Sequence, residues 1–321
     1  MIMPVLGHGA DYNPDQWLDR PDILDRDVEM MHKAHVNTVS IGIFSWARLE
    51  TEDGVYDFTW LDEVIDRLWK GGIHVILATP SGARPAWMAR KYPEVLRVAP
   101  NRHRNLFGER HNHCYTSPVY REKVKRINQL LARRFGHHPA VVLWHLSNEL
   151  GGECHCELCQ QAFRGWLEKK YGTIEALNKA WNAKFWSHDY PDFSYIESPA
   201  PHGEHSVHGL KLDWKRFVSH QTIDFMKWER DCVREIIPDA KVCVNMMYFY
   251  EGIDYFEMAK EIDLVSWDAY PTWHKPTETI EQTAMDTGFM HDLIYSVKGE
   301  PFWLMENLSL IHISEPTRQE A

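Results

Sequence analysis

Hydrophobic and polar positions follow two different periods along this chain. Short, continuous apolar runs alternate with longer segments in which apolar residues recur at helical spacing. The short runs predict buried β-strands, and the longer segments predict amphipathic helices. The predicted strands span residues 5–12, 38–46, 74–80, 140–149, 241–247, 264–270 and 302–307. Strands that alternate with helices in this way indicate a parallel α/β fold.

Two of the predicted helices have clear end signals. The first begins after Ser117, a common N-cap residue type, has Pro118 at its first position and ends at Gly136. Its apolar side chains fall on one face: Val124, Ile127, Leu131 and Phe135. The second helix spans about 211–237 and stops before Pro238.

Polar residues gather at the C-terminal ends of the predicted strands. A barrel of parallel strands carries its active site on that face, so the pattern predicts a (β/α)8 TIM barrel. The chain supplies about seven βα units, and the barrel is therefore expected to be incomplete. A doubly wound sheet is the structural alternative, but the sequence has no glycine fingerprint for a dinucleotide.

Composition narrows the class of ligand. The chain has 321 residues, of which 44% are hydrophobic and 25% charged, and its formal net charge is −11. That charge argues against nucleic-acid and membrane partners, which reward clustered Lys and Arg. The first residues lack the basic and apolar regions of a secretion signal, and no apolar run is long enough for a transmembrane helix. We expect a cytoplasmic protein with a small or neutral ligand.

The last fourteen residues, 308–321, do not continue the pattern of strands and helices. Residues 308–318 resemble the in-frame translation of a sequencing adapter, which predicts a non-native tail. An ordinary irregular loop is the alternative. Under the first interpretation residues 1–307 form a truncated catalytic barrel domain, and its activity is in question.

Two glutamates lie at the ends of predicted strands. Glu149 follows Asn148 at the end of the fourth strand, and Glu306 precedes Asn307 at the end of the seventh. Hydrolysis of a glycosidic bond needs one carboxyl group to protonate the leaving oxygen and a second to attack or to activate water. Opposite strands of a barrel can supply that pair across its mouth. For either glutamate alone, a helix N-terminus or a surface charge is the better explanation, but two on opposing strands, one preceded by Asn, favour the catalytic pair.

Four cysteines form a second candidate site: Cys114, Cys154, Cys156 and Cys159. Four thiolates satisfy a tetrahedral Zn²⁺ and leave no open position for a substrate, so such a zinc is structural. His155 is an alternative fourth ligand, and four reduced thiols without metal are the simpler alternative. Cys232 and Cys243, in a predicted helix and strand, are explained as small buried hydrophobic residues.

The sequence resembles glycoside hydrolase family 42, the β-galactosidases, over nearly all of residues 12–307. The resemblance rests on segments that occur in the same order as in that family: DYNPDQW, FSWARLETEDGVYDFTWLD, CYTSPVYR, SNE, CHCELCQQAFRGWLEKKYGTIEALNKAWNAKFWS, VSWDAYP and FWLMEN. It implies a retaining β-galactosidase that removes terminal, non-reducing β-D-galactosyl units by double displacement without a catalytic cofactor. A β-fucosidase or an α-L-arabinopyranosidase stays open, as does a zinc-stabilised carbohydrate-binding or scaffolding module without turnover.

The resemblance also implies roles for single residues. Glu149 matches the general acid/base, Glu306 the nucleophile and Asn148 a donor to the sugar 2-hydroxyl, while Arg110 and Tyr270 match galactose-binding positions. The four cysteines match a zinc site, with Cys114 rather than His155 as the fourth ligand. A homotrimer is implied for the complete protein. Some family members carry Arg and Glu where this chain has Ser40 and Ile43.

Overall fold

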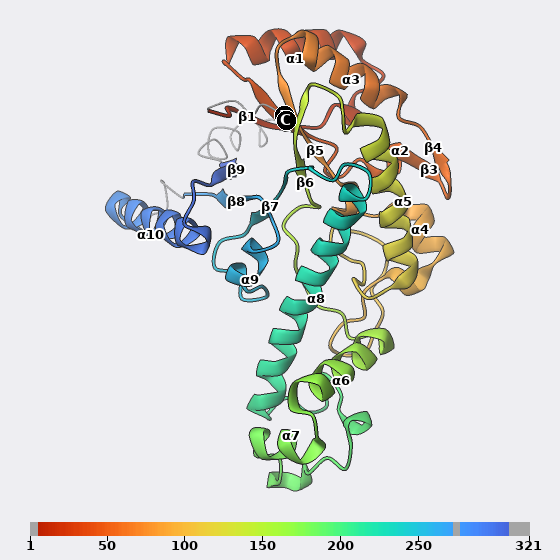
Figure 1. The fold of residues 1–321 in the computed structure, drawn as a ribbon, viewed down its shortest axis with the longest axis vertical. Coiled ribbons are helices and arrows are strands. Elements are labelled where there is room, and N and C mark those ends of the chain that lie inside the picture. The colour runs from red at the N-terminus through yellow and green to blue at the C-terminus, as the bar shows by residue number, and fades with distance from the viewer. Residues whose placement is uncertain (1–5, 272–276, 308–321) are drawn as a thin grey trace.

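A computed structural model of the chain describes residues 6–271 and 277–307 (Figure 1). Its main sheet has seven parallel strands in the order β1-β2-β5-β6-β7-β8-β9. The strands span Gly9–Tyr12 (β1), Thr38–Ile41 (β2), His74–Ala78 (β5), Val141–His145 (β6), Val242–Met246 (β7), Leu264–Ala269 (β8) and Trp303–Asn307 (β9). Each predicted strand is therefore present in shortened form, and the predicted tail, 308–321, lies outside the described residues.

The strand order confirms an incomplete (β/α)8 barrel. Neighbouring strands in the sheet follow one another along the chain, apart from the small β3–β4 hairpin, Glu50–Glu52 and Val55–Tyr56. A doubly wound sheet would reverse its order partway, so that alternative is wrong. The two edge strands approach each other, because a Cβ atom placed on Gly7, just before β1, would lie 3.3 Å from the Trp303 ring on β9.

Helices follow most of the strands and lie around the sheet (Figure 1). They are α1 (Pro21–Lys33), α2 (Trp46–Leu49), α3 (Thr59–Lys70), α4 (Ala86–Lys91), α5 (Pro118–Phe135), α8 (His208–Arg234), α9 (Tyr255–Ala259) and α10 (Ile280–Lys298). The Ser117 hydroxyl accepts a hydrogen bond from the Tyr120 amide at 3.3 Å, which confirms the predicted cap of α5. The helix predicted at 211–237 is α8, displaced by three residues toward the N-terminus.

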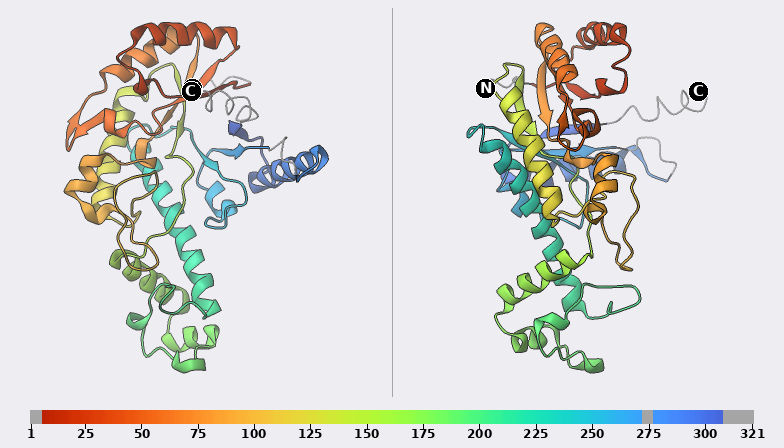
Figure 2. Two further views of the ribbon diagram at one scale, coloured as in Figure 1. Left: turned by 180° about the vertical axis from the view of Figure 1, so that it is seen from behind. Right: turned by 90° about the vertical axis from the view of Figure 1, so that its right-hand side faces the viewer.

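A helical lobe projects from the barrel between β6 and β7 (Figure 2). It comprises α6 (Glu157–Tyr171), α7 (Ile174–Trp181) and the first half of α8, and it has a hydrophobic core of its own around Phe163, Leu177 and Phe217. The second half of α8 packs into the barrel core through Phe225. One long helix thus joins the two cores. None of the helices in the described ranges is both long and apolar enough to cross a membrane.

Candidate active site

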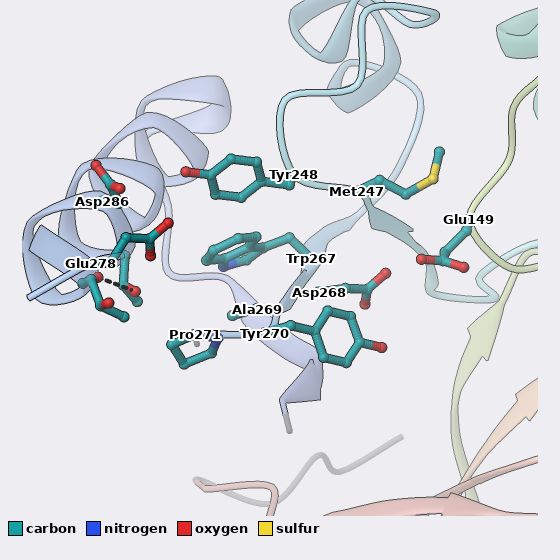
Figure 3. A pocket seen from close by; sticks show the side chains of 12 residues that line it. Glu149, Met247, Tyr248, Trp267, Asp268, Ala269, Tyr270, Pro271, Glu278 and Asp286 are labelled. Carbon is teal, nitrogen blue, oxygen red and sulfur yellow. Dashed lines mark hydrogen bonds between the residues drawn. The ribbon is translucent and has the colours of Figure 1, made fainter. Parts of the chain in front are cut away.

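Three carboxyl groups meet at the C-terminal ends of the strands. Glu149, Asp268 and Glu306 each offer an oxygen atom within 4.8 Å of the other two. Glu149 and Asp268 also line a cavity of about 560 Å³, together with Tyr270. Figure 3 shows the Glu149 and Asp268 carboxyl groups turned toward each other, with the Tyr270 ring beside them. The structure therefore brings the two predicted glutamates together and adds a third acid.

The segment that carries Glu149 leaves the strand earlier than predicted. β6 ends at His145, and both Ser147 (φ 57°) and Glu149 (φ 42°) adopt left-handed backbone conformations. Such conformations cost free energy in residues other than glycine and persist only where the surroundings enforce them. Two hydrogen bonds do so: the Ser147 amide donates to Thr79 Oγ1 at 2.6 Å, and the Glu149 amide donates to Asn245 Oδ1 at 2.7 Å.

Glu306 lies on β9 and is held through both carboxylate oxygens. The Tyr270 hydroxyl donates to Oε2, and Asn245 Nδ2 donates to Oε1 at 3.2 Å. Burial raises the pKa of Glu306, the Tyr270 hydrogen bond opposes that rise, and the nearby Asp11 and Glu149 add to it. Tyr270, predicted as a sugar-binding residue, therefore also contacts Glu306 directly.

Arg110 reaches the site from a loop with unusual backbone geometry. Its guanidinium pairs with the Glu149 carboxylate at 2.5 Å, and half of the side chain stays exposed. Both neighbours, Glu109 (φ 53°) and His111 (φ 53°), are left-handed. The buried guanidinium of Arg84 fixes the loop by donating to the carbonyl of Glu109 at 3.2 Å and to that of Gly108 at 2.6 Å.

The Asn245 side chain connects these groups, and the sequence did not single it out. Its Nδ2 atom lies within hydrogen-bond distance of three acceptors: Asn148 Oδ1 at 3.1 Å, Asp268 Oδ2 at 2.8 Å and Glu306 Oε1 at 3.2 Å. Its Oδ1 atom accepts from the Glu149 amide and contacts His145 Nε2 at 3.1 Å. Asn245 and Asp268 are polar residues inside apolar strands, and that signal was available in VCVNMM and LVSWDA.

The four predicted cysteines gather at the base of the lobe, and their sulfur atoms all lie within 4.8 Å of one another: Cys114, Cys154, Cys156 and Cys159. Cys114 Sγ lies 3.5 Å from Cys159 Sγ and 3.6 Å from Cys156 Sγ, and the Sγ atoms of Cys156 and Cys159 are 3.8 Å apart. All the cysteines of the described residues are free thiols. Four sulfurs at ~2.3 Å from one Zn²⁺ lie about 3.8 Å apart, so the donor set fits a tetrahedral metal ion. A disulfide would need about 2.0 Å.

His155 does not join the sulfur cluster. Its Nδ1 atom contacts Ser198 Oγ at 2.7 Å, and its Nε2 atom lies 3.3 Å from a Glu153 carboxylate oxygen. Both ring nitrogens are thus directed at other groups, which favours Cys114 as the fourth sulfur position. Cys232 and Cys243 lie elsewhere and are buried, as predicted.

Comparisons with known proteins agree with this geometry. The model of glycoside hydrolase family 42, described as Beta-galactosidase, matches residues 11–318. The chain belongs to glycoside hydrolase family 42. Similar curated members are the β-galactosidases BglY of Alicyclobacillus acidocaldarius, 57% identical over 300 residues, and GanA of Bacillus subtilis, 55% identical over 306 residues. These alignments cover 94% and 93% of this chain but 44% and 46% of the relatives, so the chain spans about half their length.

Solved structures of the family have the same fold. Gan42B, a family 42 β-galactosidase from G. stearothermophilus, superposes with a TM-score of 0.92 at 57% identity, covering 93% of this chain and 45% of that one. The catalytic domain of β-amylase from Paenibacillus polymyxa superposes with a TM-score of 0.66 at 12% identity, which shows a shared fold alone.

Ser40 and Ile43, the two positions where the resemblance implies other residues in some family members, are both buried. Ser40 is buried on β2 and donates a hydrogen bond to the Asp11 carboxylate, and Ile43 is buried in the loop that follows. Asp11 lies on β1, near enough to Glu306 to raise the pKa of that carboxyl. The side of the mouth formed by β1 and β2 therefore contributes a carboxylate and its hydroxyl donor to the electrostatics of the site.

Proposed function

We propose that the protein is a retaining β-galactosidase that removes terminal, non-reducing β-D-galactosyl units by double displacement. The observation that carries the proposal is the separation of the two glutamates, whose carboxyl oxygens lie within 4.8 Å. Retaining glycosidases place the two carboxyl groups about 5 to 5.5 Å apart, whereas inverting enzymes need about 6.5 to 9.5 Å to admit a water molecule. The names of the curated relatives supply the substrate class.

Glu306 is the proposed nucleophile, and Glu149 is the proposed acid/base. The Tyr270 hydroxyl and Asn245 amide hold both oxygens of Glu306, which keeps the carboxylate oriented for attack on the anomeric carbon. Glu149 protonates the leaving oxygen in the first step and removes a proton from water in the second. Asn148, fixed through its Oδ1 atom by Asn245, is the proposed donor to the sugar 2-hydroxyl.

Arg110 changes its role when substrate binds. In the ligand-free site it neutralises Glu149 through their ion pair. As a galactose-binding residue it turns its guanidinium to a sugar hydroxyl, which releases the Glu149 carboxyl group to contact the leaving oxygen. The exposed half of the Arg110 side chain leaves room for this movement.

Azide rescue tests the two roles. The Glu306→Ala chain should lose nearly all turnover of nitrophenyl β-galactoside and recover it with azide, giving galactosyl azide of inverted configuration. The Glu149→Ala chain should instead give galactosyl azide of retained configuration. Glu168→Ala, on the exposed face of α6, is the matched control and should not change turnover. The opposite pair of configurations would reverse the assignment.

The four cysteines are proposed to hold a structural Zn²⁺. A zinc ion with four thiolate ligands joins the loop of Cys114 to the beginning of α6, close to the segment that carries Glu149. The proposed catalytic steps need no cofactor. A homotrimer and a cytoplasmic location are also proposed for the complete protein, and analytical ultracentrifugation tests the first.

A further inference from the structure

Asp268 occupies an unusual position among the three carboxyl groups. It is 3% exposed, and in the register of β8 and β9 it lies directly opposite Glu306. Its Oδ2 atom accepts from Asn245 Nδ2 at 2.8 Å, whereas its Oδ1 atom has no partner among the described residues. Asp268 also lines the cavity beside Glu149 (Figure 3), although its Oδ1 atom is buried.

The charges around Asp268 are mostly negative. Glu306 on β9, Glu149 after β6 and Asp11 on β1 all raise the pKa of Asp268, in addition to the larger effect of burial, and the Asn245 amide opposes them. The remaining titratable neighbours are Tyr255 on α9, Tyr270 after β8 and His145 on β6, of which burial keeps His145 neutral by lowering its pKa. Arg110, the cation of the site, pairs with Glu149.

Three carboxylates this close cannot all be ionised, because like charges in a partly buried site destabilise one another. Glu306 has two hydrogen-bond donors, and Glu149 has the Arg110 guanidinium. Asp268 has one amide donor, is the most buried of the three and has no cation within ion-pair distance in the described residues. If the three carboxyl groups together retain one proton, that proton therefore belongs on Asp268.

We propose that Asp268 is a neutral carboxylic acid in the free protein, with its proton on the buried Oδ1 atom, and that it positions the charge of the proposed catalytic pair. This inference rests on the proposed function. A neutral Asp268 adds no charge beside the nucleophile, whereas an ionised Asp268 would place a second negative charge directly opposite Glu306 on the neighbouring strand. Burial and the surrounding carboxylates raise the pKa of Asp268 to about 9.

Asp268→Asn tests the protonation state, because an amide reproduces the neutral acid: its oxygen accepts from Asn245, and its NH2 replaces Oδ1–H. We expect the limbs of the pH profile of kcat/KM between pH 5 and 8 to stay at their positions in the parent chain. Asp268→Ala, which removes the acceptor for Asn245, should lower kcat by at least tenfold. Asp286→Asn, an exposed aspartate of the same cavity lining, is the matched control for loss of charge.

An ionised Asp268 would give a different result. Replacing it with Asn would then remove a negative charge from the site, and both limbs of the profile would move to lower pH by about one unit. That shift, absent in Asp286→Asn, would overturn the proposal.

A second measurement does not depend on turnover. Asp268 is expected to be neutral in the folded chain and ionised in the unfolded chain. The folding equilibrium constant of the parent chain should therefore fall close to tenfold per pH unit between about pH 5 and 8, relative to that of Asp268→Asn. Parallel pH dependence of the two chains would overturn the proposal. A complete protein without β-galactosidase activity would refute the proposed function, while this measurement on the present chain would still report the protonation of Asp268.

Discussion

The hydroxyl of Thr79 should be essential to the position of Glu149. Thr79 lies at the end of β5, fully buried, and its Oγ1 atom accepts the hydrogen bond of the Ser147 amide at 2.6 Å. Ser147 is left-handed, two residues before the proposed acid/base. Thr79→Val preserves the volume of the side chain and removes the hydroxyl, which also bonds the buried Glu229, so it tests hydrogen bonding rather than packing.

Two effects oppose each other in this variant. A buried amide left without an acceptor costs about 1 to 3 kcal/mol. The left-handed conformation of Ser147, which costs roughly 1 to 2 kcal/mol, loses one of the contacts that enforce it, so part of that strain is released by movement of residues 147–149. A displacement of about 1 Å at a catalytic group can lower a rate on the order of a hundredfold. The partial release of strain offsets part of the lost hydrogen bond, so we expect about 1 kcal/mol lower stability and at least a tenfold lower kcat.

Urea unfolding followed by tryptophan fluorescence measures the stability, and nitrophenyl β-galactoside hydrolysis measures kcat. Thr79→Ser keeps the hydroxyl acceptor and should retain most of the stability and most of kcat. Thr222→Val is the matched control on α8, because the buried Thr222 hydroxyl only donates to the carbonyl of Val218 within the helix. If Thr79→Val and Thr222→Val lose the same stability and neither loses kcat, the argument from the strained segment is wrong.

Two further predictions concern groups away from the proposed chemistry. Glu229 is wholly buried on α8, and burial raises its pKa to about 7, so Glu229 by itself should cost the chain about 3 kcal/mol of stability as pH rises from about 5 to 8, in addition to the loss expected from Asp268. In urea unfolding, Glu229→Gln should lack the part of the pH-dependent loss that Glu229 contributes. Equal slopes of unfolding free energy against pH in the variant and the parent chain would contradict this prediction. The cysteine geometry predicts close to one zinc per chain by metal analysis, and Cys156→Ser should lower Tm without moving the pH profile of kcat. Metal-free protein from zinc-replete medium would exclude the site.

Apolar periodicity was sufficient to predict the strands, because a barrel buries both faces of its parallel strands and so gives continuous apolar runs. It overestimated the strand of Glu149, since Ser147 and Glu149 turn into left-handed conformations that tertiary hydrogen bonds enforce. Local sequence carries no signal for such a turn in residues other than glycine. The predicted site residues Arg110, Asn148 and Tyr270 nevertheless meet the two glutamates.

The lobe and the third acid were harder to predict. The amphipathic pattern indicates that a segment is helical, but it does not show whether the apolar face of α6 packs on the barrel or on a core of its own. Asn245 and Asp268 each interrupt an apolar run once, which is also typical of a buried structural residue. Their importance follows from the meeting of three strands, which only the tertiary structure shows.

The shared helix α8 has a consequence for how the molecule opens. Its first half is buried in the lobe through Trp214 and Phe217, and its second half is buried in the barrel through Phe225 and Val233. Amide hydrogen exchange in native proteins proceeds through cooperative units that follow such separate cores. The exchange rates of the α8 amides should therefore change near the middle of the helix. The N-terminal amides should exchange when the lobe opens, and the C-terminal amides should exchange on global unfolding. The longest helix of the described chain thus belongs to two cooperative units, and a ligand that orders the barrel need not slow exchange in the lobe.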